Sequence, residues 1–166
     1  MFQIGERVVY GFHGVCCVVD LEERVIDRKK VVYMVLEPMG QGSSRFYIPT
    51  HNATAMAKIR HMLTKEQLEE LMQSETVRSG NWIPEENLRK QLYRELISKG
   101  DRAQLLRMAR SIYLHKAKQA AAGKRCHLCD ENFLRDAERL LTSEIAMILE
   151  LDPEQSKQYL RNRLTV

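Results

Sequence analysis

The sequence predicts an α+β protein in which a small β-barrel is followed by an all-α domain. The first 50 of its 166 residues contain short segments rich in Val, Ile, Tyr and Phe, separated by turns. After residue 62 the apolar residues recur at the spacing of amphipathic helices. A flat sheet of such short strands could not enclose a core, so a strongly bent barrel is expected. We place the domains at residues 1–55 and 62–166.

The predicted strands cover residues 7–10, 15–26, 31–36 and 45–48. Glycines bound the first turn at residues 11–14, polar residues 27–30 form the second, and a Gly/Ser-rich run at 40–44 forms the third. Residues 52–57 are expected to form a helical turn or a short helix. The β-rich part of the chain therefore ends shortly after Pro49.

Capping residues mark the helices of the second domain. Residues 64–67 are a capping box that predicts a short helix ending near residue 74. Pro84 suits the first turn of the next helix, whose buried face is predicted from Leu88, Leu92 and Leu96. Gly100 is expected to end this helix, and Asp101 to cap the following one.

That following helix is predicted to bury four apolar residues and to end at Gly123. Its buried residues are Leu105, Met108, Ala109 and Ile112, and its far side carries Arg107, Arg110, Ser111 and Lys118. A long helix is expected at about residues 130–150, and a last short helix begins at Pro153.

Positive charge is concentrated in one stretch of the chain. Residues 76–125 contain twelve Lys/Arg and four Asp/Glu, a net charge of +8, whereas the whole chain carries +4. Such segregation is typical of a protein that binds a polyanion. Trp82, the single tryptophan, lies in a turn-like run at residues 79–84 beside this stretch. A flat ring beside a basic surface suits a minor groove or an unstacked base step, but a core tryptophan is an equally open alternative.

The sequence contains no recognisable enzyme motif. His13 has no matching nucleophile and acid, and residues 40–42 lack the Lys and following helix of a phosphate-binding loop. Cys126 and Cys129 have metal-like spacing but no second ligand pair, so we expect unlinked cysteines and no metal or cofactor. A thiol or zinc protein that uses this pair remains the alternative. The chain shows no membrane span or signal peptide, and free thiols suit the cytoplasm.

Several segments, in order, resemble the CarD/CdnL family of bacterial transcription regulators. They are residues 4–15, 46–49, 98–101 and 130–134, and the similarity covers about residues 1–152. The resemblance implies a Tudor/SH3-like barrel that binds the β subunit of RNA polymerase. It also implies a helical domain that contacts promoter DNA upstream of the −10 element, where a tryptophan enters the minor groove and stabilises the open complex.

The resemblance assigns the polymerase-binding residues to Arg24, Ile26 and Tyr47, and Arg45 shares a face with Tyr47. Tyr47 stands where some family members carry arginine, so that ionic contact is not expected here. The family tryptophan matches Trp82. Together with the basic stretch, this predicts the DNA-binding residues Trp82, Arg89, Lys90, Arg94, Arg107 and Arg110. We expect a monomeric, non-enzymatic regulator with little sequence preference; a stand-alone RNA-binding module is a third possibility.

Overall fold

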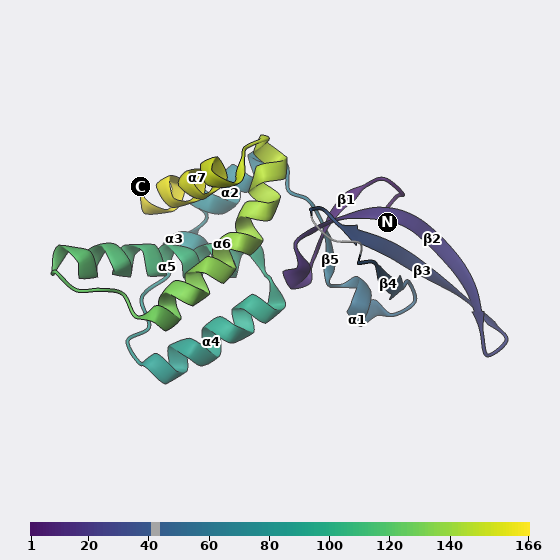
Figure 1. Ribbon diagram of the computed structural model, residues 1–166, viewed down its shortest axis with the longest axis horizontal. Coiled ribbons are helices and arrows are strands. Elements are labelled where there is room, and N and C mark those ends of the chain that lie inside the picture. Colours follow the sequence, from purple (N-terminus) through teal and green to yellow (C-terminus); the bar gives the residue numbers. More distant parts are fainter. Residues whose placement is uncertain (41–43) are drawn as a thin grey trace. The chain divides into compact units, whose positions relative to one another are not determined.

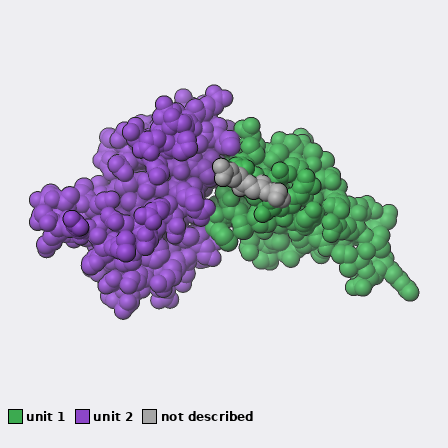
Figure 2. Space-filling view, viewed as in Figure 1, with its two compact units in different colours: residues 1–62 green, residues 63–166 purple. Residues whose placement is uncertain are grey.

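Strands precede helices along the chain in the computed structural model, which describes residues 1–40 and 44–166 (Figure 1). The chain divides into two units, residues 1–62 and 63–166, which Figure 2 shows in green and purple. The predicted α+β class is confirmed. The central residues of the turn predicted at 40–44 lie outside the described part of the chain.

The first unit is a five-stranded antiparallel sheet with the strand order β4-β3-β2-β1-β5. Its elements are β1 (Arg7–Tyr10), the 3-10 turn η1 (Gly11–His13), β2 (Val15–Ile26), β3 (Lys29–Pro38), β4 (Phe46–Pro49), α1 (Ala53–Met56) and β5 (Ile59–His61). The sequence prediction missed β5, which pairs with β1 and extends this unit past residue 55. Three residues are too few for alternating hydrophobicity to identify a strand.

A long hairpin of β2 and β3 extends from the core of this unit. Asp27 and Arg28 at its turn have φ angles of 50° and 65°, as a type I′ turn requires. The base of the hairpin contributes to a core made of Val8, Cys16, Val18, Met34, Leu36, Ile48 and Ile59. Toward the turn, both faces of the hairpin become exposed.

The second unit is built around α5 (Arg102–Ala121), which packs against each of the other helices of this unit. Its other elements are α2 (Lys65–Gln73), α3 (Glu75–Arg78), α4 (Glu86–Lys99), α6 (Leu128–Leu149) and α7 (Pro153–Thr165). The predicted capping box of α2 is present. The Thr64 hydroxyl accepts from the Gln67 N–H, and the Gln67 side-chain carbonyl accepts from the Thr64 N–H. Gly100 ends α4 in the left-handed conformation, and Asp101 caps α5. Four predicted core residues of α5, Leu105, Met108, Ala109 and Ile112, are buried.

The predicted buried face of α4 is wrong at Leu88, whereas Leu96 is partly buried and packs against the core. Leu88 is 48% exposed, and Arg89 and Tyr93 are the buried residues of this helix. The helix is turned because Arg89 pairs with a buried carboxylate of α6 and the Tyr93 ring packs edge-on against Phe133. The short helix α3 was also not predicted, and Ser111 is buried rather than on the far side of α5. Within the described residues, no helix has the length and apolar character needed to span a membrane.

Candidate functional site

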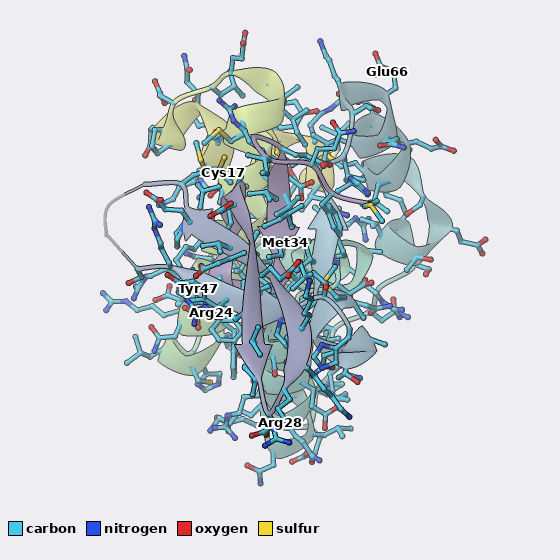
Figure 3. All side chains as sticks on the ribbon, turned by 90° about the vertical axis from the view of Figure 1, so that its right-hand side faces the viewer. Cys17, Arg24, Arg28, Met34, Tyr47 and Glu66 are labelled. Atoms are coloured by element: carbon cyan, nitrogen blue, oxygen red, sulfur yellow. The ribbon has the colours of Figure 1, made fainter. Side chains whose placement is uncertain are left out.

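The polymerase-binding residues suggested by the sequence lie on one face of the first unit. Side chains two residues apart in a strand share a face, so Arg24 and Ile26 of β2 point the same way. The Arg24 guanidinium lies over the rings of Tyr47 and Tyr33, 4.9 Å and 5.6 Å from their centroids. Figure 3 shows Arg24 beside Tyr47. The sheet therefore combines three strands into one cationic and aromatic surface.

Exposure and charge on this face are suited to contact with a protein. Tyr47 is 42% exposed and Ile26 is 44% exposed. Arg24 donates from Nε to Glu22 at 3.0 Å, and this hydrogen bond raises the pKa of Arg24. Arg45 directly precedes β4, and its Nε lies 3.6 Å from Oε2 of Glu37 on β3. We call Arg24, Ile26, Arg45 and Tyr47 the sheet face.

In the second unit, the Trp82 ring is held between two other side chains. It stacks on His115 of α5, with ring centroids 3.6 Å apart and an interplanar angle of 2°. The Arg89 guanidinium is 4.4 Å from the Trp82 centroid. An imidazole at 3.6 Å leaves no room for a second group on its face of the indole, so Arg89 lies against the other face. Trp82 is partly buried and packs at the edge of the helical core.

Arg89 is a structural residue of this unit. Its Nε and Nη2 donate to Asp130 Oδ1 and Oδ2 at 2.8 Å and 3.0 Å, and its Nη1 donates to the Ile83 carbonyl at 2.9 Å. Burial opposes its charge, but the hydrogen bonds and charge of Asp130 prevail and raise the pKa of Arg89. Because its side chain is buried, Arg89 is not available to a phosphate. We therefore remove it from the expected DNA-binding surface.

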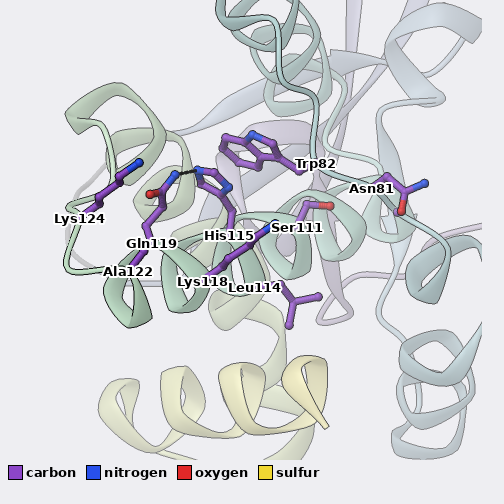
Figure 4. Close-up of a pocket in the computed structure, with 10 residues that line it drawn as sticks. Asn81, Trp82, Ser111, Leu114, His115, Lys118, Gln119, Ala122 and Lys124 are labelled. Atoms are coloured by element: carbon purple, nitrogen blue, oxygen red, sulfur yellow. Dashed lines mark hydrogen bonds between the residues drawn. The ribbon is translucent and has the colours of Figure 1, made fainter.

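A groove opens beside Trp82 and along one face of α5 (Figure 4). Its volume is about 460 Å³. The polar residues that line it are Asn81, Ser111, His115, Lys118, Gln119 and Lys124, and the remaining contacts come from Gly80, Trp82, Leu114 and Ala122. We call this feature the Trp82 groove. It combines an aromatic ring, amide groups and two exposed lysines within one concave surface.

The surroundings of His115 favour its neutral form. Burial lowers its pKa, and the nearby charges of Arg89 and Lys118 lower it further, against an opposing effect of Asp130. Its Nε2 lies 3.2 Å from Gln119 Nε2. An amide nitrogen donates only, so His115 Nε2 is the acceptor and carries no proton. In this neutral form the stacked pair carries no charge, and the lysines supply the positive charge of the groove.

The remaining predicted DNA-binding residues are spread over the unit. Arg94 is exposed on α4, and Lys90 forms an ion pair with Glu86 at 3.1 Å. Arg110 donates to the carbonyls of Leu164 and Arg78, both at 3.1 Å, and so ties α3 to the end of α7. Arg107 lies against Gly80, where a Cβ would come within 2.4 Å of its Cγ. None of these four residues lines the Trp82 groove within the described chain.

His115, Lys118 and Lys124 were not among the predicted DNA-binding residues. Helical spacing could have found two of them, because residues 111, 115 and 118 lie on one face of a helix. Lys124 follows the end of α5, and its position depends on the turn that ends the helix. Helical periodicity could therefore not have predicted that Lys124 lines the groove.

Cys126 and Cys129 lie at the start of α6, which begins at Leu128, two residues before the predicted start. Both are free and partly buried. Burial, followed by the charges of Asp130 and Glu131, raises the pKa of Cys126, so its thiol stays protonated at neutral pH. Across residues 1–40 and 44–166, no group of three or more His, Cys, Asp or Glu is arranged to hold a metal ion.

One comparison with known families identifies the first unit. Residues 2–60 match the family described as the CarD-like/TRCF RID domain. The match covers β1 to β4, including the sheet face, and ends within β5. Domains of this family mediate RNA polymerase interaction in transcription. The chain therefore carries a CarD-like RNA polymerase-interacting domain, and the resemblance to CarD/CdnL proteins is confirmed over these residues.

Proposed function

We propose that this protein binds the β subunit of RNA polymerase through the sheet face and contacts promoter DNA through the Trp82 groove. The family match supports the polymerase partner. The location of Trp82, at the wall of a groove with two lysines, is the observation that supports the DNA contact. The resulting activity is non-enzymatic stabilisation of the open promoter complex.

The composition of the sheet face supports docking on a protein. Arginine and tyrosine are enriched among residues that dominate binding energy, and here an exposed Arg24 lies against two tyrosines. The neighbouring Ile26 adds an exposed apolar side chain. This surface contains one face of the long hairpin, so a partner can reach it without unfolding of the core.

The Trp82 groove supports contact with distorted DNA. Lys118 and Lys124 can neutralise phosphates, which gives affinity without sequence preference. Both faces of the indole are already occupied by His115 and Arg89. DNA therefore meets the ring at its edge, or displaces His115 and stacks in its place. Either contact is more favourable with an unstacked base step than with closed duplex.

The mechanism is a shift in a promoter equilibrium. The polymerase-bound protein interacts with open and closed DNA, and only the difference between the two affinities changes their populations. Binding to the polymerase brings the protein to promoters, since minor-groove contacts discriminate sequence weakly. The Trp82 groove then contributes the difference in affinity between open and closed DNA.

The test is the lifetime of open complexes formed by purified RNA polymerase, measured after a heparin challenge with and without the full-length chain. A longer lifetime, together with retention of the chain by isolated β subunit, is the expected result. Retention by the polymerase with an unchanged lifetime would refute the DNA part of the proposal. Tight binding to free RNA without polymerase would instead favour a stand-alone RNA-binding module.

A further inference from the structure

The chain passes from the last strand of the first unit to the core of the second through one residue, Met62. On one side, β5 ends at His61, which pairs with Val8 of β1 and whose Nδ1 lies 2.6 Å from Glu6 Oε1. On the other side, Leu63 packs against the core of the second unit. Consecutive Cα atoms are about 3.8 Å apart, so residues two positions apart are separated by at most about 7 Å. The two anchored ends of the connection therefore stay within that distance.

A buried ion pair holds the beginning of the second unit. Glu144 of α6 is 6% exposed, and its Oε1 accepts from the Leu63 backbone N–H at 2.9 Å. Arg102, the first residue of α5, donates from Nε and Nη2 to the two carboxylate oxygens of Glu144, both at 2.8 Å. Removing one partner of such a pair leaves a buried charge uncompensated, so the arrangement is costly to break. Leu63 is therefore fixed to α5 and α6.

The Arg102–Glu144 pair has no part in either proposed binding surface. Within the described chain, neither residue lines the Trp82 groove or belongs to the sheet face. A buried ion pair is often no more stabilising than well-packed apolar side chains of similar volume. Apolar side chains could not, however, supply the acceptor for the Leu63 N–H. The property that is particular to this pair is therefore its hold on the connection between the units.

We propose that Arg102 and Glu144 are positioning residues, which fix Leu63 so that Met62 alone connects the polymerase-bound sheet to the helices that carry the Trp82 groove. This inference rests on the proposed function. While the sheet face is on the polymerase, so short a connection limits the stretch of promoter DNA that the groove can reach. Because minor-groove contacts discriminate sequence weakly, the connection contributes to the choice of position. About ten additional flexible residues would extend the reach by about 18 Å, or about five base pairs.

The experiment inserts about ten Gly/Ser residues after Met62 in the full-length chain. The same insertion after Glu150, an exposed residue between α6 and α7, is the matched control. The local concentration of the groove at the DNA falls roughly as the −3/2 power of the length of a flexible connection, so the gain in open-complex lifetime should shrink about tenfold or more. Hydroxyl-radical footprints of the chain should spread by about five base pairs. The control should alter neither, and both variants should keep their affinity for the β subunit.

A second variant tests the ion pair itself. Arg102→Leu with Glu144→Met replaces the pair by apolar side chains, which should preserve the fold and release the Leu63 N–H. Amide hydrogen exchange should then accelerate at Leu63 while amides in the middle of α6 stay protected. The released connection would run from Met62 to Thr64, the residue before α2. Three connecting residues in place of one should reduce the gain in lifetime about fivefold.

Three results would overturn the inference. They are a lifetime gain and a footprint that survive the insertion after Met62, an equal loss from the insertion after Glu150, and an unchanged exchange rate of the Leu63 amide in the double variant. Each of these leaves the proposed function standing, because the wild-type chain still prolongs the open complex. A wild-type chain that leaves the lifetime unchanged would instead refute the proposed function, and this inference with it.

Discussion

Trp82 and His115 form a parallel stack, with centroids 3.6 Å apart, although 33 positions separate them in the sequence. The stack attaches the turn before α4 to the middle of α5. It places the single tryptophan at the wall of a basic groove, yet leaves it partly buried against the core. Trp82 therefore packs against the core and also keeps an accessible edge. The sequence had presented core packing and an exposed ring as alternatives.

Trp82→Ala is expected to shorten open-complex lifetime about tenfold, on the scale of one lost base–aromatic contact. Because the ring is only partly buried, the loss of stability should be smaller than the roughly 3–5 kcal/mol of a fully buried aromatic. Thermal unfolding and open-complex lifetime measure the two effects. Leu160→Ala, in the buried face of α7, is the control. If this control shortens the lifetime equally while folded, the effect of Trp82 is structural.

Replacing both groove lysines, Lys118→Gln with Lys124→Gln, should reduce the salt dependence of DNA binding. Each lost phosphate contact lowers the slope of log K against log salt by about 1. DNA affinity measured across a salt series gives this slope. Lys157→Gln, on the exposed side of α7, should leave it unchanged. An unaltered slope in the double variant would place the phosphate contacts elsewhere.

Arg24→Glu should weaken binding to the polymerase β subunit about tenfold or more, because it reverses a charge and removes the stacked guanidinium from Tyr47. The Arg24 side chain is exposed, at 46%, so the melting temperature should change little. Titration against isolated β subunit measures the affinity. Lys30→Glu reverses a charge on the opposite face of the same hairpin, where Lys30 pairs with Glu23. Equal losses from both substitutions would contradict a docking site confined to the sheet face.

Asp130→Ala should destabilise the second unit by about 3–5 kcal/mol, since it leaves the Arg89 charge buried without its partner. The fluorescence of Trp82, the only tryptophan, should also report a loosened turn, because Arg89 holds the Ile83 carbonyl. Chemical unfolding measures the free energy of unfolding of each variant. Asp136→Ala, at an exposed position of α6, should change stability by less than about 0.5 kcal/mol. A comparable loss from both variants would mean that the ion pair is not the cause.

His115 should make stability fall as pH decreases from neutral. Its pKa in the folded protein is lowered, chiefly by burial, so the unfolded chain takes up a proton first. Stability is complete above the usual value near 6.5 and declines as the pH falls from there toward the folded-state pKa. The difference between wild type and His115→Gln in unfolding free energy, measured across this range, isolates the contribution. A difference that does not change with pH would contradict it.

The sequence by itself determined the order of the elements and the ends of several helices. Thr64 with Gln67, and Gly100 with Asp101, act within a few residues of themselves, so local chemistry predicts them. The strand segments and the turn between β2 and β3 were also predicted from signals that lie within a few neighbouring residues. The three-residue strand β5 was not, because its pairing with β1 involves residues about fifty positions away.

Only the tertiary structure decided how α4 faces the core and what surrounds Trp82. A leucine every fourth residue favoured Leu88, Leu92 and Leu96 as the buried face, but the Arg89–Asp130 pair turns the helix and takes Arg89 out of solvent. Likewise, the basic stretch predicted a polyanion partner without showing which cations line a common groove. Ion pairs and ring stacks between distant segments carry no periodic signal in the sequence, and their geometry is set when the helices pack.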